Sequence, residues 1–88
     1  MHRDPTPLDL SDVPRPVRLQ QLLIVELLRP PRAGEFVEQL AWKIGEPPAD
    51  AGQAANELVE KGLATRQGDF LAASRAALEL DQLWPLAL

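Results

Sequence analysis

The side chains able to do acid–base or nucleophilic chemistry are few in this sequence. Two glutamate pairs stand at helical spacing, Glu35 with Glu38 and Glu57 with Glu60. Carboxylates spaced in this way on an exposed helix turn usually serve as solvating charge and not as an acid–base pair. The chain has no cysteine and one histidine, His2. We therefore expect no catalytic triad, no Cys nucleophile and no metal site built on His or Cys.

The rest of the composition excludes further classes. The five glycines are scattered and form no Gly-rich phosphate loop. We expect no catalytic residue, no cofactor and no metal, and we do not expect an enzyme. The longest apolar run, residues 22–25, is far shorter than the roughly 20 residues of a membrane-spanning helix. The N-terminus lacks the apolar segment of a secretory signal, so the expected location is cytoplasmic, without a membrane partner.

The spacing of apolar residues predicts a mainly α-helical domain with a small β-hairpin. The predicted helices cover residues 15–29, 35–45, 49–61 and 75–84. Their inner faces are expected to include Val17 and Leu22 in the first helix and Val59 in the third. Two short strands, residues 63–66 and 70–72, flank Gln67-Gly68-Asp69, which is typical of a tight turn. Gly45 is expected to cap the second helix.

At 88 residues the chain is expected to form one domain in three segments. Residues 1–13, which carry two prolines and three aspartates, are predicted to be an extended, disordered or draped N-terminal arm. Residues 14–75 are predicted to form the core. Residues 76–88 are predicted to be a C-terminal helix with an apolar tail, a candidate dimerisation element.

The order of these elements is helix, helix, tight turn, helix, hairpin, helix. Before the turn the sequence has Leu40-Ala41 followed by Ile44-Gly45. After the turn it has Leu58 followed by Gly62-Leu63. On these residues the chain resembles the winged helix-turn-helix domains of bacterial transcription regulators. The resemblance implies a three-helix core with a wing, residues 49–61 as recognition helix and Gln67-Gly68-Asp69 as wing tip. It also implies a DNA duplex as partner and a homodimer.

A DNA-binding surface would combine the recognition helix, the wing and the basic start of the first helix. Its candidate residues are Gln53, Asn56, Arg66, Gln67, Arg15 and Arg18. The charge opposes this function, because residues 47–62 carry Asp50, Glu57 and Glu60 against Lys61 alone. DNA readers place Arg or Lys against phosphates and base edges, and the whole chain has a net charge of −4.

The alternative function is a winged-helix protein-interaction module in a DNA-processing or regulatory complex, with the acidic third helix as partner surface. Trp42 is either packed on a neighbouring segment or an exposed anchor for the partner. The candidate interface residues are Trp42, Leu80, Leu83 and Trp84. A role as a DNA mimic has only the sign of the charge in its favour.

Overall fold

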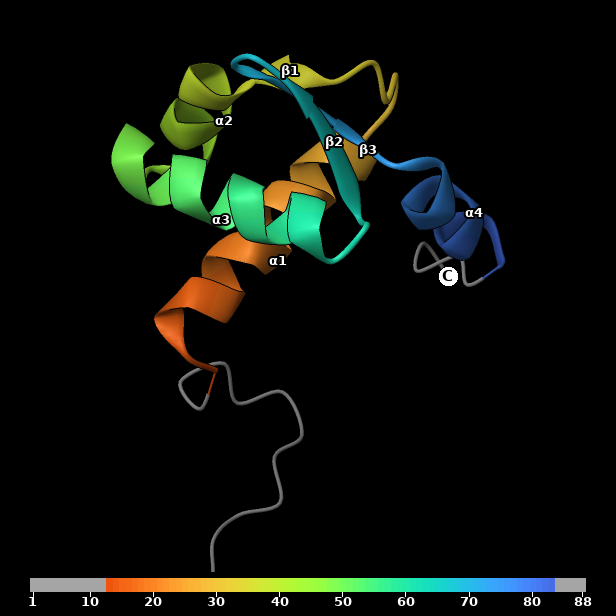
Figure 1. The fold of residues 1–88 in the computed structure, drawn as a ribbon, viewed down its shortest axis with the longest axis horizontal. Coiled ribbons are helices and arrows are strands. Elements are labelled where there is room, and N and C mark those ends of the chain that lie inside the picture. Colours follow the sequence, from red (N-terminus) through yellow and green to blue (C-terminus); the bar gives the residue numbers. More distant parts are fainter. Residues whose placement is uncertain (1–12, 84–88) are drawn as a thin grey trace, which may run out of the picture.

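The computed structural model describes residues 13–83, which form four helices and three strands (Figure 1). The elements are α1 (Arg15–Leu28), β1 (Glu35–Phe36), α2 (Val37–Ile44), α3 (Pro48–Glu60), β2 (Ala64–Gln67), β3 (Phe70–Ala73) and α4 (Arg75–Leu83). The predicted mainly helical fold with a small β-hairpin is confirmed, a third strand extends the hairpin to a small antiparallel sheet, and the arrangement is compatible with a winged-helix-like fold. Positions 1–12 of the expected N-terminal arm and Trp84 in the tail lie outside the described residues.

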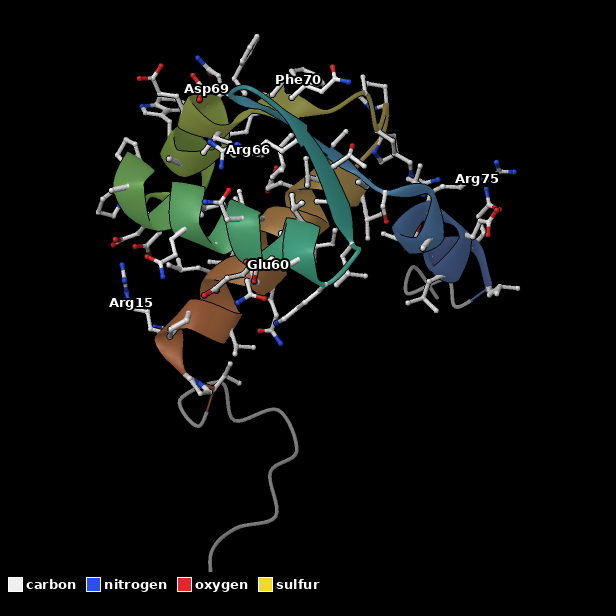
Figure 2. All side chains as sticks on the ribbon, in the orientation of Figure 1. Arg15, Glu60, Arg66, Asp69, Phe70 and Arg75 are labelled. Carbon is white, nitrogen blue, oxygen red and sulfur yellow. The ribbon has the colours of Figure 1, made fainter. Side chains whose placement is uncertain are left out.

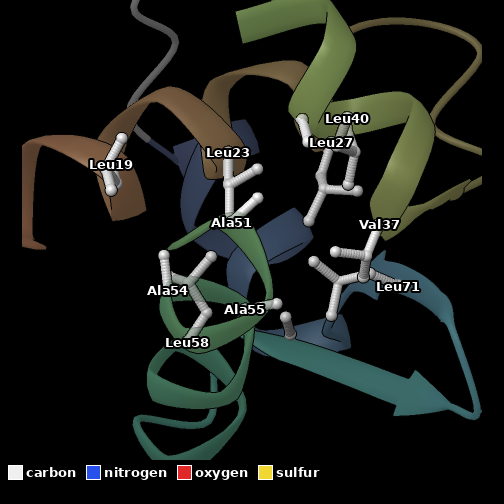
Figure 3. Packing of buried hydrophobic residues seen from close by; sticks show 12 residues of the cluster. Leu19, Leu23, Leu27, Val37, Leu40, Ala51, Ala54, Ala55, Leu58 and Leu71 are labelled. Carbon is white, nitrogen blue, oxygen red and sulfur yellow. The ribbon is translucent and has the colours of Figure 1, made fainter. Parts of the chain in front are cut away.

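The core lies between α1, α2, α3 and the inner face of the sheet (Figure 3). Its largest fully buried side chains are leucines, one from each of these elements: Leu23, Leu40, Leu58 and Leu71. Each contributes about 1.5–3 kcal/mol through its burial. The buried residues of α3 are mostly alanines. Their small side chains let α3 approach the neighbouring helices closely.

The inner faces of α1 and α3 are narrower than the sequence predicted. Buried leucines follow one another at four-residue intervals along α1, at positions 19, 23 and 27. Val17 and Leu22 flank this stripe and remain 38% and 39% exposed, and Val59 at the end of α3 is 37% exposed. The prediction of these three residues on inner faces was therefore wrong, because each helix is covered on one side only.

Strand β1 was not predicted. It pairs antiparallel with β3, Glu35 opposite Leu71 and Phe36 opposite Phe70, so the sheet order is β1-β3-β2. Helix α2 consequently begins at Val37, whose amide donates to the Asp69 carbonyl at 2.8 Å. Gly34, with φ 89°, directly precedes β1. A Cβ on Gly34 would lie 2.6 Å from the Phe70 ring and 2.9 Å from the Leu71 carbonyl oxygen. Only glycine fits this approach.

The turns agree with the sequence more closely. Gly45 caps α2 in the left-handed region with φ 72°, as predicted. Strands β2 and β3 form a hairpin around Gly68-Asp69, with Gln67 opposite Phe70. Ser74 links this hairpin to α4, because its hydroxyl donates to the Gly62 carbonyl at 2.6 Å and accepts from the Ala77 amide at 3.1 Å. No helix among residues 13–83 is long and apolar enough to cross a membrane.

Candidate interaction face

Three shallow hollows adjoin one another along α2, α3 and the hairpin. The first, lined by Trp42, and the second, lined by Phe36, share Glu38 and Pro48. The second and the third share Gly52 and Arg66, and the third continues along α3 to Glu60. These hollows form one continuous surface, which we call the α3 face.

The α3 face is strongly acidic. Among residues 13–83, five carboxylates and one basic residue, Arg66, line its three hollows. The carboxylates belong to Glu38, Glu46, Glu57, Glu60 and Asp69. Because charges of one sign gathered along a groove raise the local concentration of counter-charges, this face favours cations and repels anions.

The one arginine of the face is held by bonds within the protein. Arg66 donates from Nη1 to Asn56 Oδ1 at 2.6 Å and from Nε to the Gly68 carbonyl at 2.8 Å. Its Nη2 also lies 3.6 Å from Asp69 Oδ1. Figure 2 shows Arg66 reaching from β2 toward α3. Arg66 and Asn56, both predicted to face DNA, are thus bonded to each other, whereas Gln53 and Gln67 are exposed.

Arg15 is engaged at the turn between α2 and α3. Its guanidinium donates to Glu46 Oε1 at 2.5 Å and to Asp50 Oδ2 at 3.0 Å. The hydrogen bond to Asp50 and then the charge of Glu46 raise the pKa of Arg15. Arg18 is exposed and has no ion pair within residues 13–83. Figure 2 shows Arg15 and Arg66 apart, so these two arginines do not share one cationic patch.

Trp42 is the most conspicuous apolar residue of the α3 face. This residue is 81% exposed, so within residues 13–83 it is not packed on a neighbouring segment; its role as an anchor for a partner stays a prediction. Phe36 is 56% exposed and meets Phe70 edge to face, with ring centroids 5.3 Å apart. The face therefore presents two aromatic side chains among its carboxylates.

The predicted interface residues do not come together. Leu80 and Leu83 are 53% and 82% exposed on α4. Figure 1 shows α2, which carries Trp42, and α4 at opposite ends of the domain. Trp84 lies outside the described residues.

One polar cluster beside the α3 face had no signal in the sequence. Gln20, only 6% exposed, donates from Nε2 to Glu57 Oε1 at 2.6 Å and accepts from Lys61 Nζ. This contact ties α1 to the end of α3. A glutamine between leucines in an apolar helix gives no indication of its partners, because they follow some 40 residues later.

The described part of the chain shows no group of three or more His, Asp or Glu side chains that could hold a metal ion. Neither a scan of known protein families nor a search of curated proteins found a match for this chain. The chemistry of the α3 face is therefore what points to a function.

Proposed function

We propose that the chain is a cytoplasmic winged-helix protein-interaction module whose α3 face binds a basic segment of a partner protein. In this assignment α2 and α3 form the helix-turn-helix and the β2–β3 hairpin is the wing. The order α1-β1-α2-α3-β2-β3 supports the winged-helix assignment. Such a fold does not by itself distinguish a protein partner from DNA.

The charge of the α3 face carries the proposal. Among residues 13–83, five carboxylates line its hollows; Glu46 is bonded to Arg15 and Asp69 is paired with Arg66, which leaves the other three without an ion pair. Arg66, the one cation in this lining, is also bonded to Asn56. A DNA reader needs free Arg or Lys on this surface for phosphates and base edges. Complementary charge across a protein interface instead steers association and suppresses wrong partners. A basic protein surface is therefore the counterpart that this face favours.

DNA reading by a dimeric regulator is the competing function. In its favour, Gln53 and Gln67 are exposed on α3 and at the end of β2, and Arg18 is exposed on α1. A duplex contacting both amides would also approach Glu57 and Asp69, whose carboxylates repel phosphate. Binding of a DNA duplex is the result that would favour this function.

Fluorescence anisotropy with the full chain separates the two functions. The probes are a labelled hexa-arginine peptide and a generic labelled DNA duplex, each titrated across a salt series. We expect the peptide to bind with an affinity that falls as salt rises. We expect no duplex binding even at about 10 mM salt, where the screening length is near 30 Å.

Matched variants locate the binding surface. Glu60→Gln removes an exposed carboxylate from the α3 face, and Glu79→Gln removes an exposed one from α4, where it pairs with Arg75 at 3.2 Å. We expect weaker peptide binding only in the first. A duplex Kd of about 10⁻⁴–10⁻⁶ M at physiological salt, lost on Arg18→Glu, would overturn the proposal in favour of the regulator.

A further inference from the structure

The end of the α3 face at Trp42 forms a groove of its own. Its walls are Ala41 and Trp42 from α2 and Pro48 from α3, and its polar lining is Glu38, Gln39 and Glu46. We call it the Trp42 groove. An indole that is 81% exposed beside a proline offers flat apolar surface to a partner, and Trp is enriched among residues that dominate binding energy.

Glu38 is the carboxylate of this groove that remains available. It precedes Trp42 by four residues, so the two side chains are neighbours on one face of α2. The other carboxylate, Glu46, accepts from Arg15. Within residues 13–83 Glu38 has no ion pair, and Lys43 of the same helix is paired with Glu35 at 2.9 Å.

We infer that the Trp42 groove receives a cationic side chain of the partner's basic segment, and an arginine in preference to a lysine. A guanidinium stacked on the indole gains a cation–π attraction and can donate to Glu38 at the same time. Its planar fork suits both contacts better than an ammonium does. The inference rests on the proposed function and names the anchor through which the acidic face would hold its partner.

The charge around the groove selects this occupant over two others. A partner carboxylate or phosphate would meet Glu38 at close range and be repelled. A purely apolar side chain would cover Glu38 without replacing its hydrogen bonds to water, which is unfavourable. A cation satisfies the carboxylate and the aromatic face together.

The emission of Trp42 gives a direct test. The chain has two tryptophans, so Trp84→Phe in the full chain leaves Trp42 as the sole reporter. Hexa-arginine, hexalysine and hexa-citrulline are titrated against this chain; citrulline keeps the shape of arginine without its charge. We expect hexa-arginine to change the emission saturably, hexalysine to bind more weakly and hexa-citrulline to leave the emission unchanged.

Substitutions in the groove assign the anchor. By anisotropy, Trp42→Ala and Glu38→Gln should each weaken hexa-arginine binding by about two- to fivefold, the range expected for one exposed cation–π contact or ion pair. Trp42→Phe should weaken it less, because a smaller ring remains. Glu79→Gln on α4 is the control and should leave binding unchanged. Trp42 and Glu38 are both exposed, so their variants should fold, which circular dichroism verifies.

The outcomes separate the anchor from the function. If Glu60→Gln weakens hexa-arginine binding but Trp42→Ala and Glu38→Gln do not, the Trp42 groove is not the anchor. The acidic α3 face would then still be the partner surface. An equal response to hexa-citrulline would also overturn the anchor, because the charge would then be irrelevant. If the unsubstituted chain binds neither hexa-arginine nor hexalysine, the proposed function itself fails.

Discussion

Replacing Gly34 by alanine tests the close approach of β1 to β3. Gly34 has φ 89°, and its missing Cβ would lie 2.9 Å from the Leu71 carbonyl oxygen and 2.6 Å from the Phe70 ring. The ring can turn away, but the carbonyl belongs to the central strand of the sheet. Backbone must therefore shift in the Gly34→Ala variant.

The expected decrease in the free energy of unfolding has two parts. An L-residue in this left-handed region costs about 1–2 kcal/mol, and forcing a methyl group into filled space costs about 1–3 kcal/mol. The sum of about 2–5 kcal/mol is a large share of the roughly 5 kcal/mol available to so small a domain. We expect Gly34→Ala to be marginally folded at room temperature.

Gly62→Ala is the matched control. Gly62 also has positive φ, 78°, but nothing lies within 4 Å of its missing Cβ. The free energy of unfolding of this variant should fall only by the cost of a left-handed L-residue, about 1–2 kcal/mol. Thermal unfolding followed by circular dichroism measures both variants, and the Gly34 variant should melt about 4–24 °C below the Gly62 variant. Equal melting temperatures would refute the close approach and the β1–β3 pairing built on it.

Three further predictions concern the core, the hairpin and the assembly. Leu23→Ala, at a fully buried position, should lower the free energy of unfolding by about 2–5 kcal/mol. Leu83→Ala, at an 82% exposed position, should change it by less than about 0.5 kcal/mol. Urea titration compares the two variants, and similar losses would contradict the placement of α1. Arg66→Ala should lower the free energy of unfolding by about 1 kcal/mol and speed amide hydrogen exchange in the hairpin. Unchanged exchange would mean that the bond between Arg66 and Asn56 does not hold the hairpin. Because Leu80 and Leu83 leave α4 apolar on an exposed side, we expect a homodimer at micromolar concentration by light scattering, and a monomer would remove this expectation.

The helices were predictable because each carries a strong periodic signal. The Leu19, Leu23 and Leu27 stripe and the alanines of α3 give both the element type and the buried face. Gly45 and Ser74 mark helix ends through local chemistry, which a sequence displays directly. The hairpin was predictable for the same reason, since Gly68 stands in a tight-turn sequence between two short segments, residues 63–66 and 70–72.

Strand β1 could not be predicted, because two residues carry no period and the pairing partner Phe70 follows some 35 positions later. The same limit applies to the α3 face. Its acidity can be counted in the sequence, but the engagement of Arg66 and Arg15 by nearby acceptors is a tertiary fact. These two arginines, candidates for a DNA-facing surface, bond to side chains of the protein itself in the structure.

If a partner binds the α3 face as proposed, the bonds of Arg66 affect the rate and strength of that binding. By joining Gly68 at the hairpin tip to Asn56 on α3, this side chain makes the two elements of the α3 face one preorganised unit. A partner then spends little of its binding energy on ordering a loose hairpin. Complex formation should accordingly approach a rigid-body docking step, with its rate set by electrostatic steering and not by a slow rearrangement of the hairpin.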